Sequence, residues 1–445
     1  MKYLKKFFFI FLVILVSFSI FGNIVIHSTS NNNPGGAFGK TESAIVFFAK
    51  IPSNSIKIIK CYLFNNIEAC SGFGGDEFTY TKHKKKKKGL TIFSSNPNHL
   101  EGYIIFSRYF KDKGKNLVHL YDIKNDKILY EWDPDIDEIN KISNFDRSQK
   151  NLEMDSNRKR YLFYHPVLLS NGSIITHSSS PLIKIDRCSN LVWQIDKRFH
   201  HSINLDSENN IWVPILEIPG KYKSIHNLYH DDGIAKVSLD GTILLEKSVT
   251  EILIENNLFE LVLNVYYGDD PIHLNDIEPV NFDSNYWLKG DVFLSIRSLS
   301  LVILYRPSTN KVIWYKQGPW RFQHDIDLVD QNTIAIFDNN VTLGWDESPN
   351  TNNLYFYNFD NETSEKKYEK LFINHNINSR TGSLYRILNN DDIYVEEEDH
   401  GRILRGDSEG NLRWEFIWNS LINWSRYISE EEFKKFDFIE QECQK

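Results

Sequence analysis

The chain has 445 residues, of which 41% are hydrophobic and 14% aromatic, so it can bury a substantial core. This length exceeds one typical compact domain, although a repeat architecture can carry it as a single unit. A net charge of −8 argues against nucleic acid, and against a strongly anionic surface, as the main partner. That balance still permits a local cationic pocket.

The N-terminus has the pattern of a membrane segment. Lys2, Lys5 and Lys6 precede residues 7–26, which contain no charged side chain. A helix of this length, at about 1.5 Å rise per residue, covers roughly 30 Å, the thickness of the hydrocarbon core of a bilayer. The run is long for the apolar part of a secretory signal, and no clear Ala-x-Ala site follows, so we expect an uncleaved signal anchor.

The basic flank predicts the orientation and the division of the chain. Positive residues before a span stay in the cytoplasm, so the rest of the chain should lie on the extracytoplasmic (periplasmic) side of the cytoplasmic membrane. We expect residues 1–28 to form this single-pass anchor, residues 29–75 a tether leading into the fold, and residues 76–445 the folded domain. The tether contains the polar and flexible sequence NNNPGGAFG.

The four cysteines do not predict a metal site. Cys61 and Cys70 lie close enough in sequence to be the expected disulfide of an exported chain. Cys188 falls in a predicted turn and Cys443 near the end, and neither has the CxxC or Cys/His spacing of a metal centre. We therefore assign neither a metal nor a cofactor.

A basic run, KHKKKKK at residues 82–88, leads into the strand-like sequence LTIF. Such a run can bind nucleic acid or lipid headgroups. Because it directly precedes a strand, we interpret it as a solvated loop.

From Glu101 onward one pattern recurs about six times: a strand pair with a polar turn, a strand ending in aspartate, and a strand that often carries tryptophan. The copies include NLVHLYDIKNDKILYEWD, PLIKIDRCSNLVWQID, GIAKVSLDGTILLEK, DVFLSIRSLSLVILYRPSTNKVIWYK, NLYFYNFDNETSEKKYEKL and GRILRGDSEGNLRWEF. Each unit has four strands of about 4–8 residues separated by Asn, Asp, Gly or Ser turns, which is typical of a propeller blade. The sequence therefore predicts an all-β, six-bladed β-propeller after the N-terminal transmembrane helix.

Two further features have structural interpretations. Trp193, Trp314 and Trp414 end the same type of strand, so we expect them to pack between blades. Residues 249–267 carry apolar side chains at helical spacing, and we expect this insertion to cover one end of the propeller or to wall a pocket.

Residues 323–340, QHDIDLVDQNTIAIFDNN, predict one β-hairpin that begins at a histidine. Ile326 and Leu328 alternate with aspartates, and the period of two resumes after a polar turn. HHSINLDSENNIWVP repeats the design, with His201 in the place of His324. Two hairpins that each begin with a histidine suggest that the blades present their first residues to a shared site.

Residues with reactive or charged side chains concentrate between His200 and His324. His273 and Asn275 occur in PIHLND, and Arg297 lies inside an apolar strand, FLSIRSLSLVILY. A buried arginine must reach solvent, a carboxylate or an anionic ligand, because an unpaired buried charge is costly. Its fixed donors suit a tetrahedral oxyanion. These residues can converge at the mouth of the central channel.

Each of these side chains also has a purely structural interpretation. A histidine can form a hydrogen bond inside a blade, and Arg297 can belong to a buried ion pair. Five further histidines are interpreted as turn or surface residues: His165, His177, His226, His230 and His400.

The motifs HHSINL, HLNDIEPV, FLSIRSLSLVILY, KVIWYKQG and QHDIDLVDQNTIAIFDNN resemble, in this order, those of the arylsulfate sulfotransferase (arylsulfotransferase) family, in its exported or membrane-anchored branch. The resemblance implies a six-bladed propeller. It also implies transfer of a sulfuryl group from an aryl sulfate ester to a phenolic acceptor through a sulfohistidine, independently of 3′-phosphoadenylyl sulfate. The partners implied are these two small molecules.

Residue roles follow from the matched motifs. The resemblance implies that His324 is the nucleophile, that Arg297 binds the sulfate, and that His273 and His201 support the reaction. The doublet HHSI leaves His200 as an alternative to His201. We expect Asn275 and His200 to bind the substrate.

The sequence is also compatible with a function that is not enzymatic. This alternative is a non-catalytic extracytoplasmic propeller that binds or assembles partners. A quinone-cofactor dehydrogenase is disfavoured, because the sequence has no adjacent cysteine pair and no cluster of calcium-binding carboxylates.

If residues 7–26 are an anchor, the full chain should remain with membranes after washing with alkaline carbonate. Protease added on the extracytoplasmic side should then digest the tether or the folded domain. Removal of the residues before Thr41 should give a soluble folded domain, because the tether contributes no core. Recovery of a mature chain that begins near Ser28 would contradict the uncleaved anchor.

Overall fold

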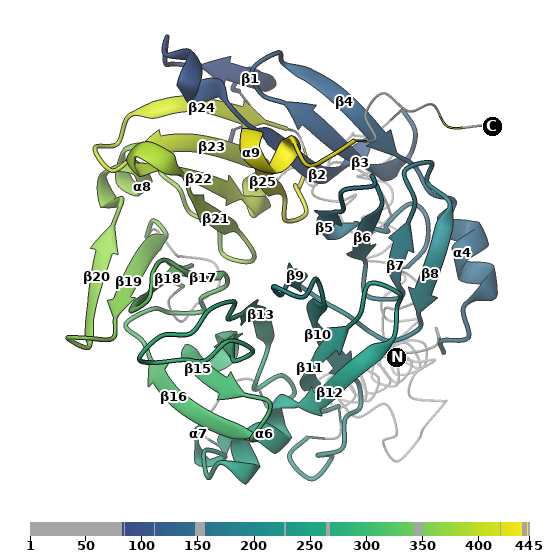
Figure 1. The fold of residues 1–445 in the computed structure, drawn as a ribbon, viewed down its shortest axis with the longest axis vertical. Helices are drawn as coiled ribbons and strands as arrows, with labels where there is room; N and C mark the ends of the chain where they lie inside the picture. The colour runs from purple at the N-terminus through teal and green to yellow at the C-terminus, as the bar shows by residue number, and fades with distance from the viewer. Residues whose placement is uncertain are drawn as a thin grey trace, which may run out of the picture. The chain divides into compact units, whose positions relative to one another are not determined.

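The computed structural model describes residues 82–83, 85–110, 112–146, 156–226, 228–263, 268–341, 350–418, 420–437 and 443. In this part of the chain, six antiparallel sheets are arranged around a central axis as the blades of a propeller (Figure 1). The strands nearest the axis, called inner strands, are β25 (Arg426–Ile428), β5 (Tyr164–Leu168), β9 (Asn204–Leu205), β13 (Leu274–Pro279), β17 (Ile326–Leu328) and β21 (Leu384–Ile387) of blades 1 to 6. The predicted all-β, six-bladed propeller is therefore confirmed.

Blades 1 to 3 each have four strands. Blade 1 consists of β25 (Arg426–Ile428), β2 (Tyr103–Phe110), β3 (Lys115–Asp122) and β4 (Lys127–Trp132). Blade 2 consists of β5 (Tyr164–Leu168), β6 (Ile174–His177), β7 (Leu182–Ile185) and β8 (Leu191–Ile195). Blade 3 consists of β9 (Asn204–Leu205), β10 (Ile211–Glu217), β11 (Asp231–Val237) and β12 (Ile243–Ser248).

Blades 4 to 6 follow in chain order. Blade 4 consists of β13 (Leu274–Pro279), β14 (Val292–Ile296), β15 (Leu301–Arg306) and β16 (Lys311–Gln317). Blade 5 consists of β17 (Ile326–Leu328), β18 (Thr333–Asp338), β19 (Asn353–Asn358) and β20 (Thr363–Lys367). Blade 6 consists of β21 (Leu384–Ile387), β22 (Asp392–Glu397), β23 (Arg402–Asp407), β24 (Leu412–Ile417) and β1 (Gly89–Ile92).

The two ends of the described chain close the ring, because each end adds a strand to a blade formed mainly by the other end. The C-terminal strand β25 pairs with β2 as the inner strand of blade 1, and Ile428 lies opposite Tyr103. The N-terminal strand β1 pairs with β24 at the outer edge of blade 6. A disulfide between Cys188 and Cys443, with Cα atoms 5.5 Å apart, adds a covalent link between blade 2 and the C-terminus. The first and last blades therefore depend on each other for folding.

Apolar side chains pack between neighbouring blades. The second strand β18 is buried at every position, whereas the outermost strand β16 alternates between exposed and partly buried positions. Trp193, Trp314 and Trp414 each join an apolar cluster, as predicted. The Trp193 indole also donates to the backbone oxygen of Leu239, 2.9 Å away.

The predicted helical insertion forms α6 (Val249–Glu255) and α7 (Glu260–Leu263). Ile252 and Leu253 pack into the apolar cluster shared by blades 3 and 4. Both helices lie at the outer edge of the ring in Figure 1, and none of their described residues lines the cavity of the candidate site. The insertion therefore stabilises an edge of the propeller, which differs from the expected cover of one end or wall of a pocket.

The remaining helices among the described residues are short and lie outside the sheets. They are α4 (Ile136–Ile142), α8 (Glu369–Asn374), α9 (Glu430–Phe433), and the 3-10 turns η1 (Pro97–Leu100), η2 (Arg297–Leu299), η3 (Asn389–Asp391) and η4 (Glu398–His400). The C-terminal helix α9 begins with a capping box between Ser429 and Glu432. This cap fixes the chain just after strand β25.

The predicted anchor, the tether and the Cys61–Cys70 pair lie outside the described residues. Within the ranges given above, no helix is long and apolar enough to cross a membrane.

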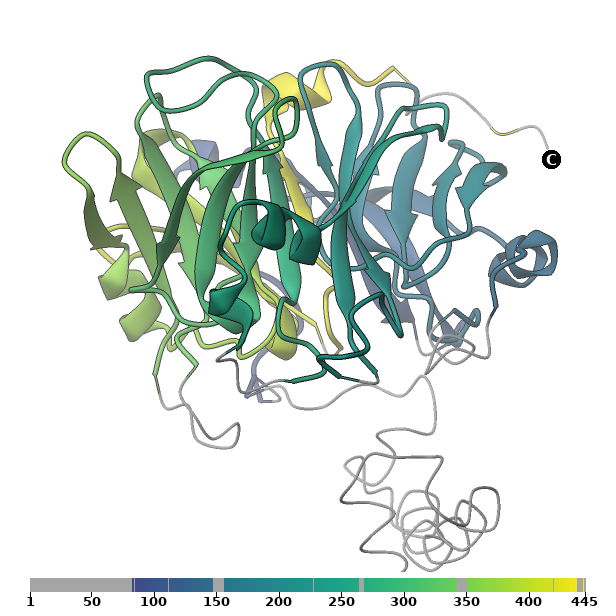
Figure 2. The same ribbon diagram turned by 90° about the horizontal axis from the view of Figure 1, so that it is seen from below.

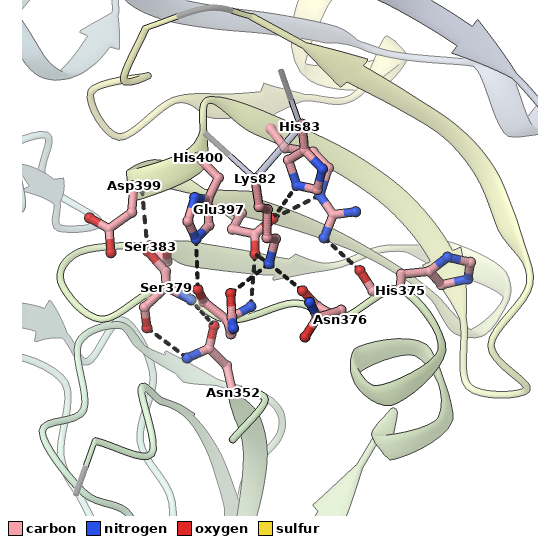
Figure 3. A network of polar contacts seen from close by, with 12 residues as sticks. Lys82, His83, Asn352, His375, Asn376, Ser379, Ser383, Glu397, Asp399 and His400 are labelled. Atoms are coloured by element: carbon pink, nitrogen blue, oxygen red, sulfur yellow. Dashed lines mark hydrogen bonds and ion pairs between the residues drawn. The ribbon is translucent and has the colours of Figure 1, made fainter. Parts of the chain in front are cut away.

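The basic run forms the predicted loop, and Lys82, Lys85, Lys86 and Lys87 are exposed, but His83 is buried and two of the lysines form ion pairs with blade 6. Lys82 forms an ion pair with the buried carboxylate of Glu397, and the imidazole of buried His83 lies 3.2 Å from the same carboxylate (Figure 3). Lys86 pairs with Glu415 at 2.8 Å. The run docks onto blade 6 because that blade carries carboxylates that these cations neutralise.

Candidate active site

The start of every inner strand lies at one end of the propeller, which is called the mouth. The end of the second strand of each blade lies there too, because the second strand pairs antiparallel with the inner strand. His201, His273 and His324 each precede the inner strand of their blade, while Arg297 and Glu398 directly follow a second strand. Residues far apart in sequence therefore meet at the mouth. Figure 2 shows the blades from the side.

These residues surround a cavity of about 330 Å³, called the histidine cavity below. Its wall consists of Tyr164, His177, Ser179, Phe199, His200, His201, His273, Arg297, His324, Thr381, Gly382, Glu398 and Trp424. Five of the six predicted site residues belong to this wall. The cavity joins an arginine, several imidazoles and three aromatic rings, which suits an anionic aromatic ligand.

Asn275 is the predicted site residue that does not line the cavity. It is fully buried on β13, and its side-chain amide donates to the backbone oxygen of Gln323, 2.8 Å away. Asn275 therefore supports the segment that precedes His324, which differs from the substrate-binding role predicted for it.

A left-handed backbone interrupts the alternation of side chains just before several inner strands. His201 has φ of 57°, His273 has φ of 51° and Trp424 has φ of 53°. Non-glycine residues adopt this conformation at a cost of about 1–2 kcal/mol. Strain of this kind clusters at functional sites, where the surrounding structure holds it in place.

The imidazole of His324 is held by hydrogen bonds on both ring nitrogens. Its Nδ1 lies 2.6 Å from Oδ1 of Asn339, and its Nε2 accepts the backbone N–H of Gly382 at 2.9 Å. The Asn339 amide group donates to the backbone oxygens of Ser379 and Gly382, which leaves Oδ1 as an acceptor. Nδ1 must therefore carry the proton, and Nε2 has the lone pair.

Their environment keeps the imidazoles of His324 and His201 uncharged. Burial is the main cause that lowers the pKa of His324 well below its usual range, and the charge of Arg297 adds to it. Burial, followed by the neighbouring His200, likewise lowers the pKa of His201. A neutral imidazole is the nucleophilic form, so His324 is ready to react over the physiological pH range.

Arg297 supplies the positive charge of the cavity. It is 4% exposed, and its guanidinium carbon lies 4.8 Å from the ring centroid of Phe322, within the range of a cation–π contact. Its backbone N–H donates to the backbone oxygen of His273 at 3.0 Å. Arg297, His324 and His201 all belong to the cavity wall, and the charge of Arg297 lowers the pKa of both imidazoles.

The other cavity histidines form one group. The ring centroid of His201 lies 5.2 Å from that of His273 and 5.9 Å from that of His324. Nδ1 of His273 lies 2.5 Å from a carboxylate oxygen of Asp270. Burial is the largest single influence on Asp270 and opposes its ionisation, but the combined interactions with His273, His230 and His200 lower the pKa of this carboxyl to about 2. The Asp270 carboxylate therefore orients the His273 ring.

The doublet His200 and His201 contributes both of its rings. Their Nδ1 atoms lie 2.7 Å apart, and both residues belong to the cavity wall. Nε2 of His200 lies 3.1 Å from a carboxylate oxygen of Asp232. The motif therefore does not have to be assigned to one histidine or the other.

Two histidines that were predicted to be turn or surface residues are buried. His177 is fully buried, lines the cavity and lies 3.2 Å from the backbone oxygen of His201, and burial lowers its pKa to about 3. His165 is 5% exposed, and its Nδ1 accepts the backbone N–H of Ile203. The prediction is wrong because His165 lies on the inner strand β5 of blade 2 and His177 on the second strand β6, and both contact the backbone of the segment that leads into blade 3.

Sequence reasoning also missed Asn339, Gly382, Glu398 and Trp424. Gly382 belongs to the loop at residues 375–383, between α8 and β21, which comes from a different blade than His324. It adopts φ of +63°, and a side chain at this position would collide with the carboxyl group of Glu398. Only glycine fits between the carboxyl group and His324.

A network of polar contacts holds this loop against blades 5 and 6 (Figure 3). The Asn378 N–H donates to Glu397 at 2.7 Å, and the Asn352 amide donates to the backbone oxygen of Ser379 at 2.8 Å. Lys82 also reaches the loop, through the side-chain oxygen of Asn378 at 2.6 Å. The basic run therefore helps to position the backbone that contacts His324.

Comparisons with known proteins address the family and the fold. Residues 165–419, more than half of the chain, match the family described as arylsulfotransferase (ASST). A search of curated proteins gave no match. Similar solved structures include a protein of unknown function from Bacteroides caccae, with 11% identity and a TM-score of 0.48, covering 74% of this chain and 100% of that one. TolB from Acinetobacter baumannii has 8% identity and a TM-score of 0.41, covering 74% of this chain and 67% of its own.

The substitution Asn339→Asp should raise the pKa of His324. A carboxylate against Nδ1 favours the imidazolium, so the pH at which His324 titrates should rise by on the order of one unit. NMR titration of the protein with isotopically labelled histidine measures this change, and Asn358→Asp on the same blade is the matched control. An unchanged titration of His324 in Asn339→Asp would contradict the hydrogen-bond assignment.

Proposed function

Because the chain belongs to the arylsulfotransferase family, we propose that it transfers a sulfuryl group from an aryl sulfate ester to a phenol, through a sulfohistidine at His324. The observation that carries this proposal is the lone pair of His324 Nε2 in the same cavity as Arg297. The reaction needs a nucleophile and a fixed positive charge at one place, and this cavity holds both.

In the first half-reaction, Nε2 of His324 attacks the sulfur of the bound aryl sulfate. The N–S bond forms while the bond between sulfur and the aryl oxygen breaks, and the aryl group leaves as a phenolate or phenol. Nε2 gives up its hydrogen bond from Gly382 as its lone pair forms the new bond. The proton on Nδ1 stays in place, where Asn339 accepts its hydrogen bond and stabilises the positive imidazole ring.

In the second half-reaction, the oxygen of an acceptor phenol attacks the same sulfur. The N–S bond breaks, its electron pair returns to Nε2, and the acceptor leaves as a new aryl sulfate. A covalent intermediate divides one difficult displacement into two easier ones. The donor and the acceptor can use the same aromatic surface, formed by Tyr164, Phe199 and Trp424.

Arg297 stabilises the transferred group. Sulfuryl transfer, like phosphoryl transfer, spreads negative charge over non-bridging oxygens. Fixed donors aimed at such oxygens in a water-poor site supply much of the rate enhancement of enzymes. The planar fork of a guanidinium can bind two of these oxygens at once.

The location of the enzyme forms part of the proposal. We propose that residues 7–26 anchor the propeller on the extracytoplasmic side of the membrane. The disulfide between Cys188 and Cys443 supports an oxidising compartment, because such bonds are rare in the cytosol.

His324→Ala should abolish transfer and leave the fold intact. The side chain contributes the nucleophile, whereas Ile326 and its neighbours supply the packing of blade 5. Release of 4-nitrophenol from its sulfate ester, with phenol as the acceptor, measures turnover, and thermal unfolding measures the fold. His226→Ala, a histidine outside the cavity wall, should keep full turnover. Normal turnover in His324→Ala would eliminate this nucleophile, whereas an inactive wild-type protein that still binds aryl sulfates would favour the binding module.

Arg297→Lys should slow the reaction without unfolding the protein. Lysine preserves the charge but loses the planar fork, so kcat should fall by a factor on the order of 10² or more. The matched control is Arg321→Lys, because Arg321 is exposed and lies outside the cavity wall. Steady-state kinetics with varied donor gives both parameters. A change in KM alone would show that Arg297 binds the ground state and the transition state equally well.

A further inference from the structure

Glu398 places a carboxyl group inside the histidine cavity. The residue is 6% exposed and directly follows strand β22, at the mouth. Its Oε2 accepts the indole N–H of Trp424 at 2.8 Å and the backbone N–H of Ser383 at 3.2 Å. The hydroxyl group of Tyr164 donates to Oε1 at 3.5 Å, which is long for such a bond. Two closer donors occupy Oε2, so Oε1 is the oxygen that can carry a proton.

This carboxyl group lies next to the reacting nitrogen. Oε2 is so close to the Cα atom of Gly382 that any side chain there would collide with it. The N–H of the same glycine donates to Nε2 of His324 at 2.9 Å. The carboxyl group of Glu398 and the nucleophile are therefore separated by a single glycine, and both belong to the cavity wall.

The surroundings of Glu398 favour its protonated form. Burial is the main cause that raises the pKa of Glu398 well above its usual range, and the neighbouring carboxylates of Glu396 and Asp399 raise it further. Tyr164 is the other titratable group in direct contact, and burial raises its pKa well above 10. The adjacent Glu397 pairs instead with Arg402, Lys82 and His83. These surroundings therefore favour a proton on Glu398, inside the cavity.

The proposed reaction transfers one proton in each half: the leaving aryl oxygen gains a proton, and the acceptor phenol loses one. A simple phenol has a pKa of about 10, like the tyrosine side chain, so its phenolate is a poor leaving group at neutral pH unless it is protonated. The acceptor phenol must lose a proton when its oxygen bonds to sulfur. The strongly lowered pKa values of His201 and His324, and the raised pKa of Tyr164, make these groups poor proton donors near pH 7.

We propose that Glu398 is the general acid and general base of this site. In the first half-reaction, Glu398 gives its proton to the aryl oxygen while the bond from that oxygen to sulfur breaks. In the second half-reaction, the Glu398 carboxylate takes the proton from the acceptor phenol while the new S–O bond forms. The proton count is balanced over the two steps, and no other reactant is needed. This inference rests on the proposed sulfuryl transfer and extends it to a second catalytic residue.

The test compares two donors whose leaving groups differ in basicity. 4-Nitrophenolate leaves readily without a proton, whereas unsubstituted phenolate does not. For Glu398→Gln, kcat/KM for phenyl sulfate should fall by a factor on the order of 10², as expected for loss of a general acid. The value for 4-nitrophenyl sulfate, measured with the same acceptor, should fall far less. Glu415→Gln is the matched control, because this buried carboxyl group belongs to the same blade, on β24, and lies outside the cavity wall.

The wild-type enzyme provides a second test that needs no variant. The ratio of kcat/KM for phenyl sulfate to that for 4-nitrophenyl sulfate should fall as pH rises through the pKa of Glu398, because the acid is lost. Equal losses for both donors in Glu398→Gln, or a wild-type ratio that does not depend on pH, would overturn the assignment to Glu398. If wild-type protein transfers from neither donor, the proposed function itself fails, and the inference fails with it. Failure of the proposed function can be distinguished from failure of the Glu398 assignment, because an inactive wild-type protein transfers from neither donor, whichever leaving group the donor has.

Discussion

The chemistry of this propeller depends on the hydrogen bonds that fix the tautomer of one buried imidazole. Asn339 uses both protons of its amide group on backbone oxygens, so its remaining oxygen can only accept, and Nδ1 of His324 must donate. Burial and the charge of Arg297 then prevent a second proton from binding to the ring. The lone pair is therefore always on Nε2, the nitrogen against Gly382.

The propeller makes this arrangement rigid. Contacts between blades surround the channel: the carboxylate of Asp276 accepts the backbone N–H of Ile326 at 3.0 Å, and Asp325 accepts that of Tyr385 at 3.0 Å. Each of these bonds joins the start of one inner strand to the next blade. Since β25 closes the ring on blade 1, no blade can shift alone without breaking contacts at both of its neighbours.

The sequence predicted the features that depend on local patterns. Period-two alternation was sufficient for the hairpin after His324, and ordered motifs were sufficient to bring His201, His273 and Arg297 to one site. Most of the features that it missed depend on contacts between blades. Gly382 reaches His324 from the loop that leads into blade 6, and the segment after Trp424 becomes an inner strand only when β25 returns to blade 1. Asn339 lies at the end of the hairpin that begins at His324, but its role depends on the hydrogen bonds from its amide group to the loop at residues 375–383. A closer alignment of the repeats, with His165 in the position of His201, would have identified blade 2 as a contributor. The predicted anchor remains a prediction, because it lies outside the described residues.

The most direct test of the account is to trap the covalent intermediate. Protein mixed rapidly with 4-nitrophenyl sulfate in the absence of acceptor should release a burst of one nitrophenol per chain. Its intact mass should rise by one sulfuryl group, and fragmentation should place that group on His324. Addition of phenol should remove the group and yield phenyl sulfate. A burst with the label on another residue, or steady turnover without any labelled protein, would contradict the central claim that the Nε2 lone pair of His324 carries the sulfuryl group.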